Sequence, residues 1–447
     1  MWRNYFYILY GGLFILFLFS LIVDSSVLHF IISWIAFLTF FISWFFATNL
    51  FKIMSSLFFI VGVIMNLISG ADWYSIPSQM LSSFPMLLFL SMLPWIASAF
   101  TIGEYDRSIG EFIHSPDNKL SSIYGKSVTA TYSLLVFINI SAIYIAQTIL
   151  LQKIKEVSKP KRNAFIVKTT LRTFSLAAIW SPMEIIVGIT ISETGVSFLT
   201  YLPYLLGISL FLTIVDLFLN RKEFSREFIL PTEPTGANLY KTLGKLSVVL
   251  SLFFLTIISL NHFYKGDFIL IVSITILPFS LIWSFFEKRI MTFISFGWKS
   301  WKSYNNQLQN FTVLFLSLGI FSTGFNHTHI PDLLQATLEG MGNYYVLIFI
   351  FVTLIYFFMA MIGVHPIATI AILIEVLRPL FDLINPLAIG IVLIVSALAT
   401  SASAPYGINA TLTAQHLGIS PYYITKTNIS FSIMMSAVGI IIALLLI

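Results

Sequence analysis

The chain has 447 residues, of which 58% are hydrophobic and only 10% are charged, and its mean hydropathy is +0.92. Soluble domains average about 25% charged residues. The composition therefore excludes a cytosolic enzyme and a nucleic-acid-binding protein, and it argues against a disordered chain. Cys is absent, which excludes disulfides, thiolate metal sites and thiol nucleophiles. The net charge of +5 is expected to come from lysines and arginines along one membrane face of an all-α polytopic membrane protein.

Apolar runs follow one another from the N-terminus. Arg3 precedes the first run and no small-residue cleavage site follows it, so we expect a transmembrane helix and no cleavable signal. About 20 apolar residues cross a bilayer as a helix, and the stretch 288–308 is expected to be an interfacial amphipathic helix. About eleven transmembrane helices are expected, at 5–23, 27–47, 51–70, 81–102, 163–192, 198–219, 244–263, 267–286, 309–326, 384–414 and 420–446.

Two further apolar stretches, 122–152 and 343–380, carry small or polar residues at their centres. We expect each to enter and leave the membrane on the same side, as a re-entrant hairpin. With a cytoplasmic N-terminus, this arrangement leaves only Lys265 and Arg378 among the basic residues outside. If either stretch spanned once, the basic clusters at 153–162 and 288–302 would conflict with the others. The charge pattern therefore predicts two hairpins in a multi-pass protein of the cytoplasmic membrane.

The chain also resembles itself at a nearly constant offset, which is clearest as the spacing between Pro182 and Pro405. Ser181-Pro182-Met183-Glu184-Ile185 corresponds to Ala404-Pro405-Tyr406-Gly407-Ile408, and Gly195 corresponds to Gly418. Each repeat would hold five spans and one hairpin, and because five is odd the second repeat would run upside down, as in many secondary transporters. The expected division is an N-terminal helix at 1–24, a first repeat at 25–220, a cytoplasmic connector at 221–243 and a second repeat at 244–447.

One span in each repeat is interrupted by proline, at Ser181-Pro182 within 163–192 and at Ser403-Ala404-Pro405 within 384–414. Proline removes a backbone donor and clashes with the preceding turn. A broken helix is tolerated in hydrocarbon only where it lines protein or a water-filled cavity. Freed carbonyls and hydroxyls suit Na⁺, while the positive end of the helix that restarts suits an anion. A plain proline kink is the alternative at each position.

An ionisable side chain at membrane depth is a functional-site candidate. His365, at the centre of the second hairpin, would bind an anion when protonated or carry a coupling proton. A neutral histidine bonded to a backbone carbonyl is the alternative. Glu184 lies two residues past Pro182, where it would coordinate a cation, accept a proton or cap the helix that restarts.

Other charges are expected to be structural. Glu375, Arg378 and Asp382 are spaced three to four residues apart, which permits local pairing on a helix. Lys168 and Arg172 lie near the inner end of a predicted span, where long basic side chains can reach the interface. These five residues are therefore not assigned to the predicted site.

The small-residue hairpin centres and the broken helix Ser403-Ala404-Pro405-Tyr406-Gly407-Ile408-Asn409, followed by Gly418-Ile419-Ser420, resemble the ion transporter superfamily. That group includes the divalent-anion/sodium symporters of dicarboxylates and citrate. The resemblance implies eleven spans, two oppositely entering hairpins and a homodimer. The hairpin tips of that family commonly carry Ser-Asn-Thr, whereas the second tip here reads Val364-His365-Pro366 and the first has no contiguous Ser-Asn-Thr.

Carried over by position, the resemblance implies a set of substrate- and ion-binding residues, to which the position of Glu184 adds that side chain. The set is Asn139, Ser141, Ser181, Pro182, Glu184, His365, Thr369, Ser401, Ser403, Pro405 and Asn409.

We expect a secondary active transporter, and no enzyme, that moves a small organic anion by alternating access. Na⁺ or H⁺ is the expected coupling ion, no other cofactor is expected, and the expected partners are the substrate and the lipid bilayer. A cation/proton antiporter that uses Glu184 and His365 is the alternative within the same class. A polytopic membrane enzyme of surface polysaccharide assembly is the alternative of another class, although the short outer loops, with few basic residues, argue against it.

Overall fold

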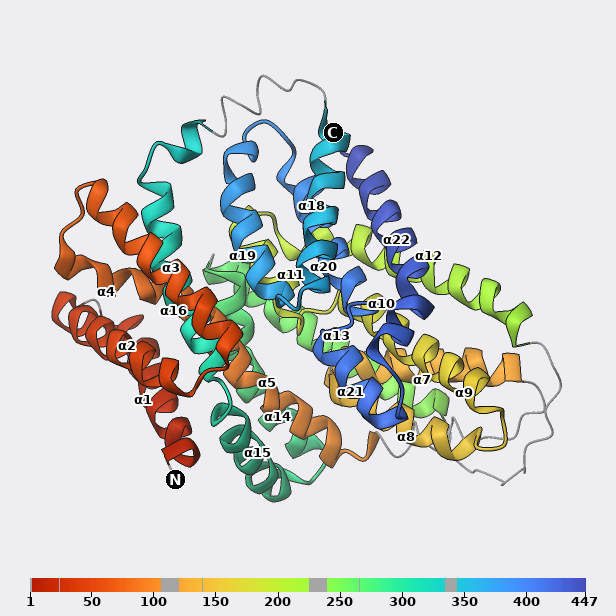
Figure 1. The fold of residues 1–447 in the computed structure, drawn as a ribbon. Coiled ribbons are helices and arrows are strands. Elements are labelled where there is room, and N and C mark those ends of the chain that lie inside the picture. Colours follow the sequence, from red (N-terminus) through yellow and green to blue (C-terminus); the bar gives the residue numbers. More distant parts are fainter. Residues whose placement is uncertain are drawn as a thin grey trace. The chain divides into compact units, whose positions relative to one another are not determined.

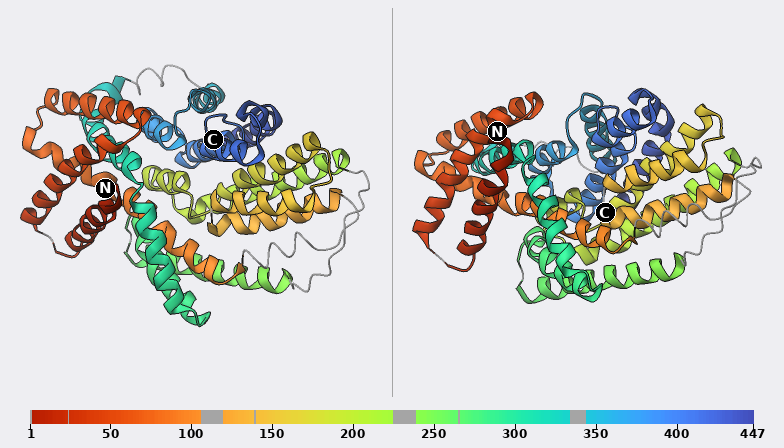
Figure 2. Two further views of the ribbon diagram at one scale, coloured as in Figure 1. Left: turned by 60° about the horizontal axis from the view of Figure 1, so that its bottom comes forward. Right: turned by 90° about the horizontal axis from the view of Figure 1, so that it is seen from below.

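The computed structural model describes residues 2–23, 25–105, 120–138, 140–224, 239–264, 266–333 and 344–447. All regular elements in these ranges are helices (Figures 1 and 2). The prediction of an all-α polytopic membrane protein is therefore confirmed. Asn139 lies outside the described residues, as does the side chain of Ser141.

Seven stretches of the described chain are helical, long and apolar enough to cross a membrane. They are α2 (Ser26–Phe46), α3 (Asn49–Ile68), the run Trp73–Ile102 that ends in α5 (Phe84–Ile102), α12 (Phe198–Glu223), α13 (Leu239–Tyr264), α14 (Phe268–Phe286) and α22 (Pro421–Leu444). The pair α15 (Ile290–Asn305) and α16 (Gln309–Asn326), bent by 63°, would be an eighth. The predicted eleven spans are not reached by this count, because the first predicted span, 5–23, and the two broken ones, 163–192 and 384–414, consist of shorter helices.

Shorter helices make up most of the rest of the described chain. α7 packs against α8 within the predicted first hairpin, and Gly363, with φ +89°, lies in the turn between α18 and α19. These helices are α1 (Phe6–Ser20), α4 (Ile76–Gln79), α7 (Leu120–Ile138), α8 (Ile140–Lys153), α9 (Lys159–Val167), η4 (Lys168–Arg172), α10 (Thr173–Ala178), α11 (Ile185–Thr194), α18 (Tyr345–Met361), α19 (Pro366–Leu377), α20 (Pro386–Ser401) and α21 (Ile408–Leu417).

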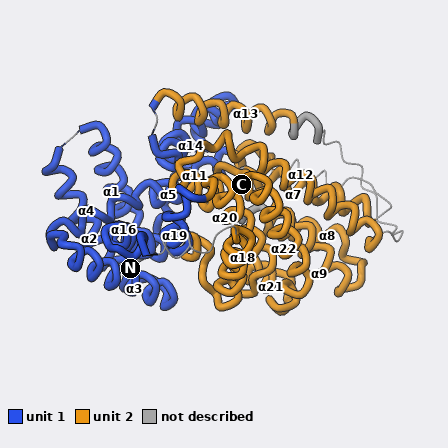
Figure 3. Tube along the Cα trace, turned by 90° about the horizontal axis from the view of Figure 1, so that it is seen from above, with its two compact units in different colours: residues 1–99, 264–342, 371–383 blue, residues 100–263, 343–370, 384–447 orange. Residues whose placement is uncertain are grey.

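The chain divides into two compact units (Figure 3). Unit 1 comprises Met1–Ala99, Tyr264–Gly342 and Ala371–Leu383, and unit 2 comprises Phe100–Phe263, Asn343–Ile370 and Ile384–Ile447. Each unit combines segments from both halves of the chain. The compact units and the predicted repeats are thus different divisions of the sequence, and the repeat boundaries stay a prediction.

Within unit 1, α3 and α16 approach closely at glycines. A Cβ at Gly62 would lie 2.7 Å from the Cα of Phe321, so only glycine fits there. The close approach allows the Asn66 Nδ2 to donate to the carbonyl of Ile320 at 3.0 Å, and Gln79 donates to the Asn66 Oδ1 at 2.6 Å. Small residues at such interfaces let backbones meet in a membrane, where the hydrophobic effect between helices is absent.

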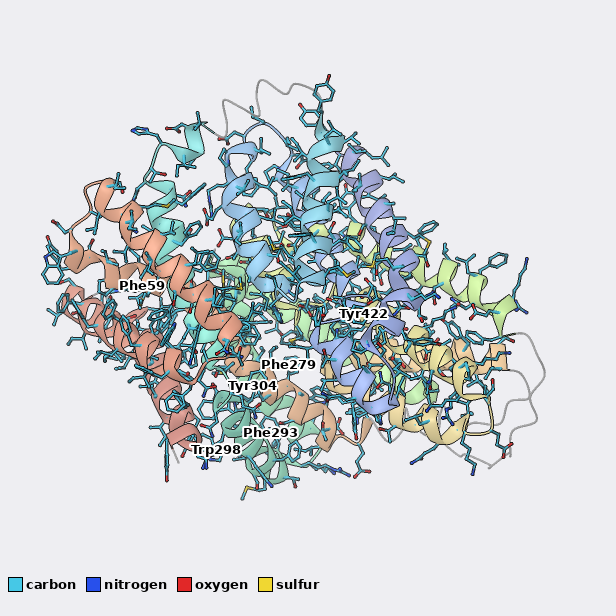
Figure 4. All side chains as sticks on the ribbon, in the orientation of Figure 1. Phe59, Phe279, Phe293, Trp298, Tyr304 and Tyr422 are labelled. Atoms are coloured by element: carbon cyan, nitrogen blue, oxygen red, sulfur yellow. The ribbon has the colours of Figure 1, made fainter. Side chains whose placement is uncertain are left out.

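α15 has the one-sided pattern that was expected of the stretch 288–308. Phe293, Gly297, Trp301 and Asn305 recur every four residues and are buried, whereas Trp298 is 51% exposed. Figure 4 labels Phe293 and Trp298 on this helix. Helical spacing of buried residues is the mark of an amphipathic helix.

Glu375 is the most buried carboxylate of unit 1 that the structure describes, at 4% exposed. Its two oxygens accept from the Nε and Nη2 of Arg378, both at 3.2 Å, which confirms the predicted local pairing. Ser322 donates to the same carboxylate at 2.5 Å and Asn326 at 3.1 Å, so α19 is also tied to α16.

Candidate functional site

The first break lies in unit 2, between α10 and α11. Residues 179–184 leave the helix around Pro182, whose missing N–H cannot continue the helical ladder. The backbone is held locally, because the Ser181 N–H donates to the Ala178 carbonyl at 3.1 Å and the Glu184 N–H to the Ser181 carbonyl at 3.1 Å. The Ser181 hydroxyl accepts from the Met183 N–H at 3.2 Å. Ser181 and Glu184 are buried, at 4% and 8% exposed.

The second break, residues 402–407, separates α20 from α21 around Pro405. The Ala404 N–H donates to the Thr400 carbonyl at 2.8 Å, and the Gly407 N–H to the Ala404 carbonyl at 3.1 Å. Ser403 is fully buried, whereas Ser401 is half-buried. Both breaks are thus short turns with buried hydroxyls, joined to a helix on either side.

The two breaks have the same backbone frame at one constant spacing along the chain, that between Pro182 and Pro405, which we call the repeat offset. α10 ends at Ala178 and α20 at Ser401, and α11 and α21 begin at Ile185 and Ile408, so both pairs are separated by the repeat offset. Both restarted helices end at a left-handed glycine, Gly195 with φ +67° and Gly418 with φ +62°. Glycine adopts this conformation without steric cost, which is why it ends so many helices.

A buried hydrogen bond recurs at the repeat offset. The Ser209 hydroxyl on α12 donates to the Leu176 carbonyl at 2.6 Å, and the Ser432 hydroxyl on α22 donates to the Ala399 carbonyl at 2.6 Å. The two donors are separated by the repeat offset, and so are the two acceptors. The same contact therefore fixes α12 to the helix before the first break, α10, and α22 to the helix before the second break, α20.

Asn409, in the first turn of α21, carries an unused acceptor. Its side chain is 7% exposed, and its Oδ1 has no hydrogen-bond partner among the described residues. Buried polar atoms are normally hydrogen-bonded, so the Asn409 Oδ1 is a candidate contact for a bound ligand. A carbonyl oxygen accepts a hydrogen bond or coordinates a cation.

The second hairpin turn lies against the second break. A Cβ at Gly363 would be 3.4 Å from the Cβ of Tyr406. Two residues on, the Nδ1 of His365 accepts from the Ile367 N–H at 3.2 Å, so the ring is bonded to backbone at the start of α19. Thr369, one turn further along α19, is buried.

The structure thus brings part of the predicted set together. Ser403 and Pro405 lie in the second break, Ser401 and Asn409 lie on the helices on either side of it, and the turn before His365 lies against it. Ser181, Pro182 and Glu184 lie in the first break. Of the residues that the structure describes, no group of three His, Asp or Glu side chains is placed to hold a metal ion. The polar groups at the two breaks are mainly hydroxyls, amides and backbone groups.

One expectation is wrong. Arg172 does not extend to an interface, because its side chain is 9% exposed and its Nη1 contacts the Asp216 Oδ1 at 2.7 Å. Asp216 was missed, although a lone acidic residue within the apolar run 198–219 was a signal. Lys168, by contrast, extends to the partly exposed Glu223 at 2.5 Å.

A second missed residue is Gln147 on α8. Its amide donates to Thr170 at 3.2 Å and to Thr413 at 2.8 Å, and its carbonyl oxygen lies 3.1 Å from the Nδ1 of His416. It thereby ties the predicted first hairpin to both broken spans. In the sequence, Gln147 is one amide within an apolar stretch. The sequence alone gives no reason to assign it, and not its polar neighbours, to the site.

The fold is similar to a solved structure, that of the Alcanivorax borkumensis YdaH transporter, reported to have an unusual topology. The TM-score is 0.64 at 13% sequence identity, and the match covers 88% of this chain and 96% of that one. No protein-family model matches the chain, and no curated protein matches it by sequence. The chain is therefore an all-helical, multi-pass membrane protein whose fold is similar to that of a transporter.

Proposed function

We propose that this protein is a secondary active transporter that moves a small organic anion across the cytoplasmic membrane by alternating access, coupled to Na⁺ or H⁺. The observation that supports this most directly is the pair of breaks whose frame and buried hydrogen bond recur at the repeat offset. Paired broken helices are the places where secondary transporters bind substrate and ions. The likeness of the fold to the YdaH transporter supports transport as the activity.

The second break is the better place for an anion. α21 begins after Gly407, which has no side chain to cap the free N–H groups of the first turn. These groups and the positive end of the helix dipole attract negative charge. At the first break Glu184 occupies the equivalent N-cap position, and its carboxylate would repel an anion. We therefore assign the anion to the second break and a coupling cation to the first.

Cation/proton antiport is the second candidate, and Glu184 is the observation that favours it. A carboxylate that is 8% exposed at a helix break can exchange a proton for a cation. A membrane enzyme of surface polysaccharide assembly is the candidate of another class. It would form product without any ion gradient.

Flux into proteoliposomes separates these candidates. We expect uptake of labelled carboxylates that rises with an imposed Na⁺ or H⁺ gradient and ceases when the gradient is dissipated. Proton movement evoked by a cation without any anion would favour antiport. Product formation without a gradient would favour the enzyme and contradict transport.

Two substitutions test the site. His365→Ala and Ser403→Ala are expected to abolish or strongly alter transport without preventing membrane insertion. The matched controls are His329→Ala and Ser78→Ala, because both side chains are exposed and remote in sequence from the breaks. Wild-type flux in both site variants would remove the second hairpin turn and the second break from the site.

The topology has its own test. The chain has no cysteine, so single cysteines can be introduced without background labelling. If 122–152 is a re-entrant hairpin, Glu104→Cys and Lys159→Cys will react with an impermeant thiol reagent from the same, cytoplasmic side. Reaction from opposite sides would contradict both the hairpin and the inverted repeat. Cross-linking in membranes would test the homodimer.

A further inference from the structure

Arg172 and Asp216 form a buried ion pair in unit 2 that the proposed function does not use. Arg172 lies in η4, a π-helical turn of the first broken span, and Asp216 lies in α12. Besides the 2.7 Å contact between them, Asp216 Oδ1 accepts from the Asn220 amide at 3.0 Å and Oδ2 from the Tyr124 hydroxyl at 2.6 Å. π-Helical turns occur often at functional sites. The pair thus joins the broken span, α12 and, through Tyr124, the predicted first hairpin.

The second repeat fills the same place without charge. The residues that follow Arg172 and Asp216 at the repeat offset are Val395 and Gly439, on α20 and α22. They also contact each other, because a Cβ at Gly439 would lie 2.8 Å from the Val395 Cγ1. An apolar contact is therefore sufficient to pack these two helices. The fold alone does not call for the ion pair, so its presence in one repeat needs another reason.

That reason lies in Asn428, on α22 of the second repeat. The Arg172 Nε donates to the Asn428 Oδ1 at 2.9 Å, and the Arg172 Nη2 donates to the Thr427 carbonyl at 2.9 Å. The Asn428 Nδ2 in turn donates to the carbonyl of Ala402 at 2.9 Å. Ala402 is the first residue of the second break. One fully buried amide thus connects the ion pair of the first repeat to the break of the second.

The first break lacks this connection. The residue that precedes Asn428 by the repeat offset is Leu205, whose side chain has no hydrogen-bonding group. Ser209 and Ser432 bond the helix before the break alike in both repeats, so the contact through Asn428 is an addition to a shared frame. It holds only the break to which we assign the anion.

We propose that Arg172 and Asp216 are positioning residues that fix the backbone of the second break through Asn428, and so couple the first broken span to the second. An amide can point either of its two ends at Ala402. The Arg172 Nε–H requires the oxygen on its own side, which leaves the Nδ2 facing the carbonyl. Asp216 holds the guanidinium so that this orientation persists. The role in transport rests on the proposed function, but the coupling between the breaks does not.

Thiol labelling tests the coupling without any transport measurement. Ser401→Cys places a reporter beside Ala402, and its reaction rate with an aqueous reagent follows the opening of the break. Asn428→Leu copies the residue of the first repeat, and Arg172→Val/Asp216→Gly copies the apolar pair of the second. We expect each to raise the labelling rate by about two- to tenfold, as loss of one hydrogen bond implies. Because both act through one amide, combining all three substitutions should raise the rate no further.

The labelling rates of these variants either support the coupling or contradict it. A wild-type rate in the Arg172→Val/Asp216→Gly variant, or in Asn428→Leu, would overturn the proposal. Rates that multiply in the triple variant would do the same, because they would show independent effects. The matched control is Glu223→Gln, which removes the partner of Lys168 at the partly exposed end of α12. It should leave the labelling rate unchanged.

The flux assay then tests whether this coupling affects transport. If the protein transports an anion, Asn428→Leu and Arg172→Val/Asp216→Gly should raise the KM for the anion by a similar factor. If no tested anion is transported, the proposed function is in question while the labelling result still decides the coupling. A raised labelling rate with an unchanged KM would show that the anion is not bound at the second break.

Discussion

Gly62 is the residue at which the structure makes its sharpest prediction about stability. In Gly62→Ala the new Cβ would lie 2.7 Å from the Cα and N of Phe321 and 2.9 Å from the Ile320 carbonyl carbon. Carbon atoms pack best at about 3.5–4.0 Å. All three neighbours are backbone atoms, so no side chain can rotate away. α3 and α16 must therefore separate, by roughly 1 Å if that packing distance is to be restored.

The expected loss in the free energy of unfolding of Gly62→Ala is the sum of three contributions. Overpacking of this kind typically costs about 1–3 kcal/mol. The separation also stretches the 3.0 Å hydrogen bond from Asn66 to the Ile320 carbonyl, whose loss would add about 1 kcal/mol. Alanine recovers about 0.5–1 kcal/mol through its higher helix propensity. The net expectation is a loss of roughly 2 kcal/mol in the free energy of unfolding.

Thermal or denaturant unfolding of the detergent-solubilised protein, followed by tryptophan fluorescence, measures this loss. Gly12→Ala in α1 is the control, because a Cβ there would meet no described atom within 4 Å. We expect that variant to be as stable as the wild type or slightly more so. A Gly62→Ala protein that unfolds at the wild-type midpoint would refute the close approach of α3 and α16.

Two further predictions concern stability and use the same assay. Gly195→Ala and Gly418→Ala should each cost about 1–2 kcal/mol, because their φ values of +67° and +62° strain any residue with a Cβ; unequal costs would contradict the equivalence of the two breaks. Glu375→Leu should cost about 1–3 kcal/mol, since Ser322 and Asn326 lose their acceptor, and Glu375→Gln should cost less because it keeps one acceptor oxygen. Equal stability of the two Glu375 variants would show that those hydrogen bonds contribute little.

The helical fold and the two interruptions could be predicted because their causes are local. Long apolar runs fix the class of protein, and Pro182 and Pro405 remove backbone donors whatever surrounds them. The glycines at 195 and 418 likewise end helices through their own conformational freedom. The constant spacing of these residues indicates a repeat even when the sequence is taken alone.

The polar contacts could not be predicted, since they depend on which helix faces pack together. Arg172 and Asp216 are 44 residues apart, and Gln147 and Thr413 are 266 apart. A basic residue near a predicted helix end extends toward water or bonds inside the protein according to its neighbours. Nothing in the sequence places an acidic partner beside Arg172, so the interfacial position was the expected one. At the centre of the predicted first hairpin, Asn139 and the side chain of Ser141 lie outside the described residues.

The replacement of Arg172 and Asp216 by Val395 and Gly439 bears on energetics as well as on packing. In the proposed alternating-access cycle, two repeats with identical contacts would give the inward-open and outward-open states equal free energies. The contacts differ here, because one position holds a buried ion pair and the position at the repeat offset holds an apolar contact. If the proposed function holds, the two states differ in free energy, and substrate binding has to overcome that difference.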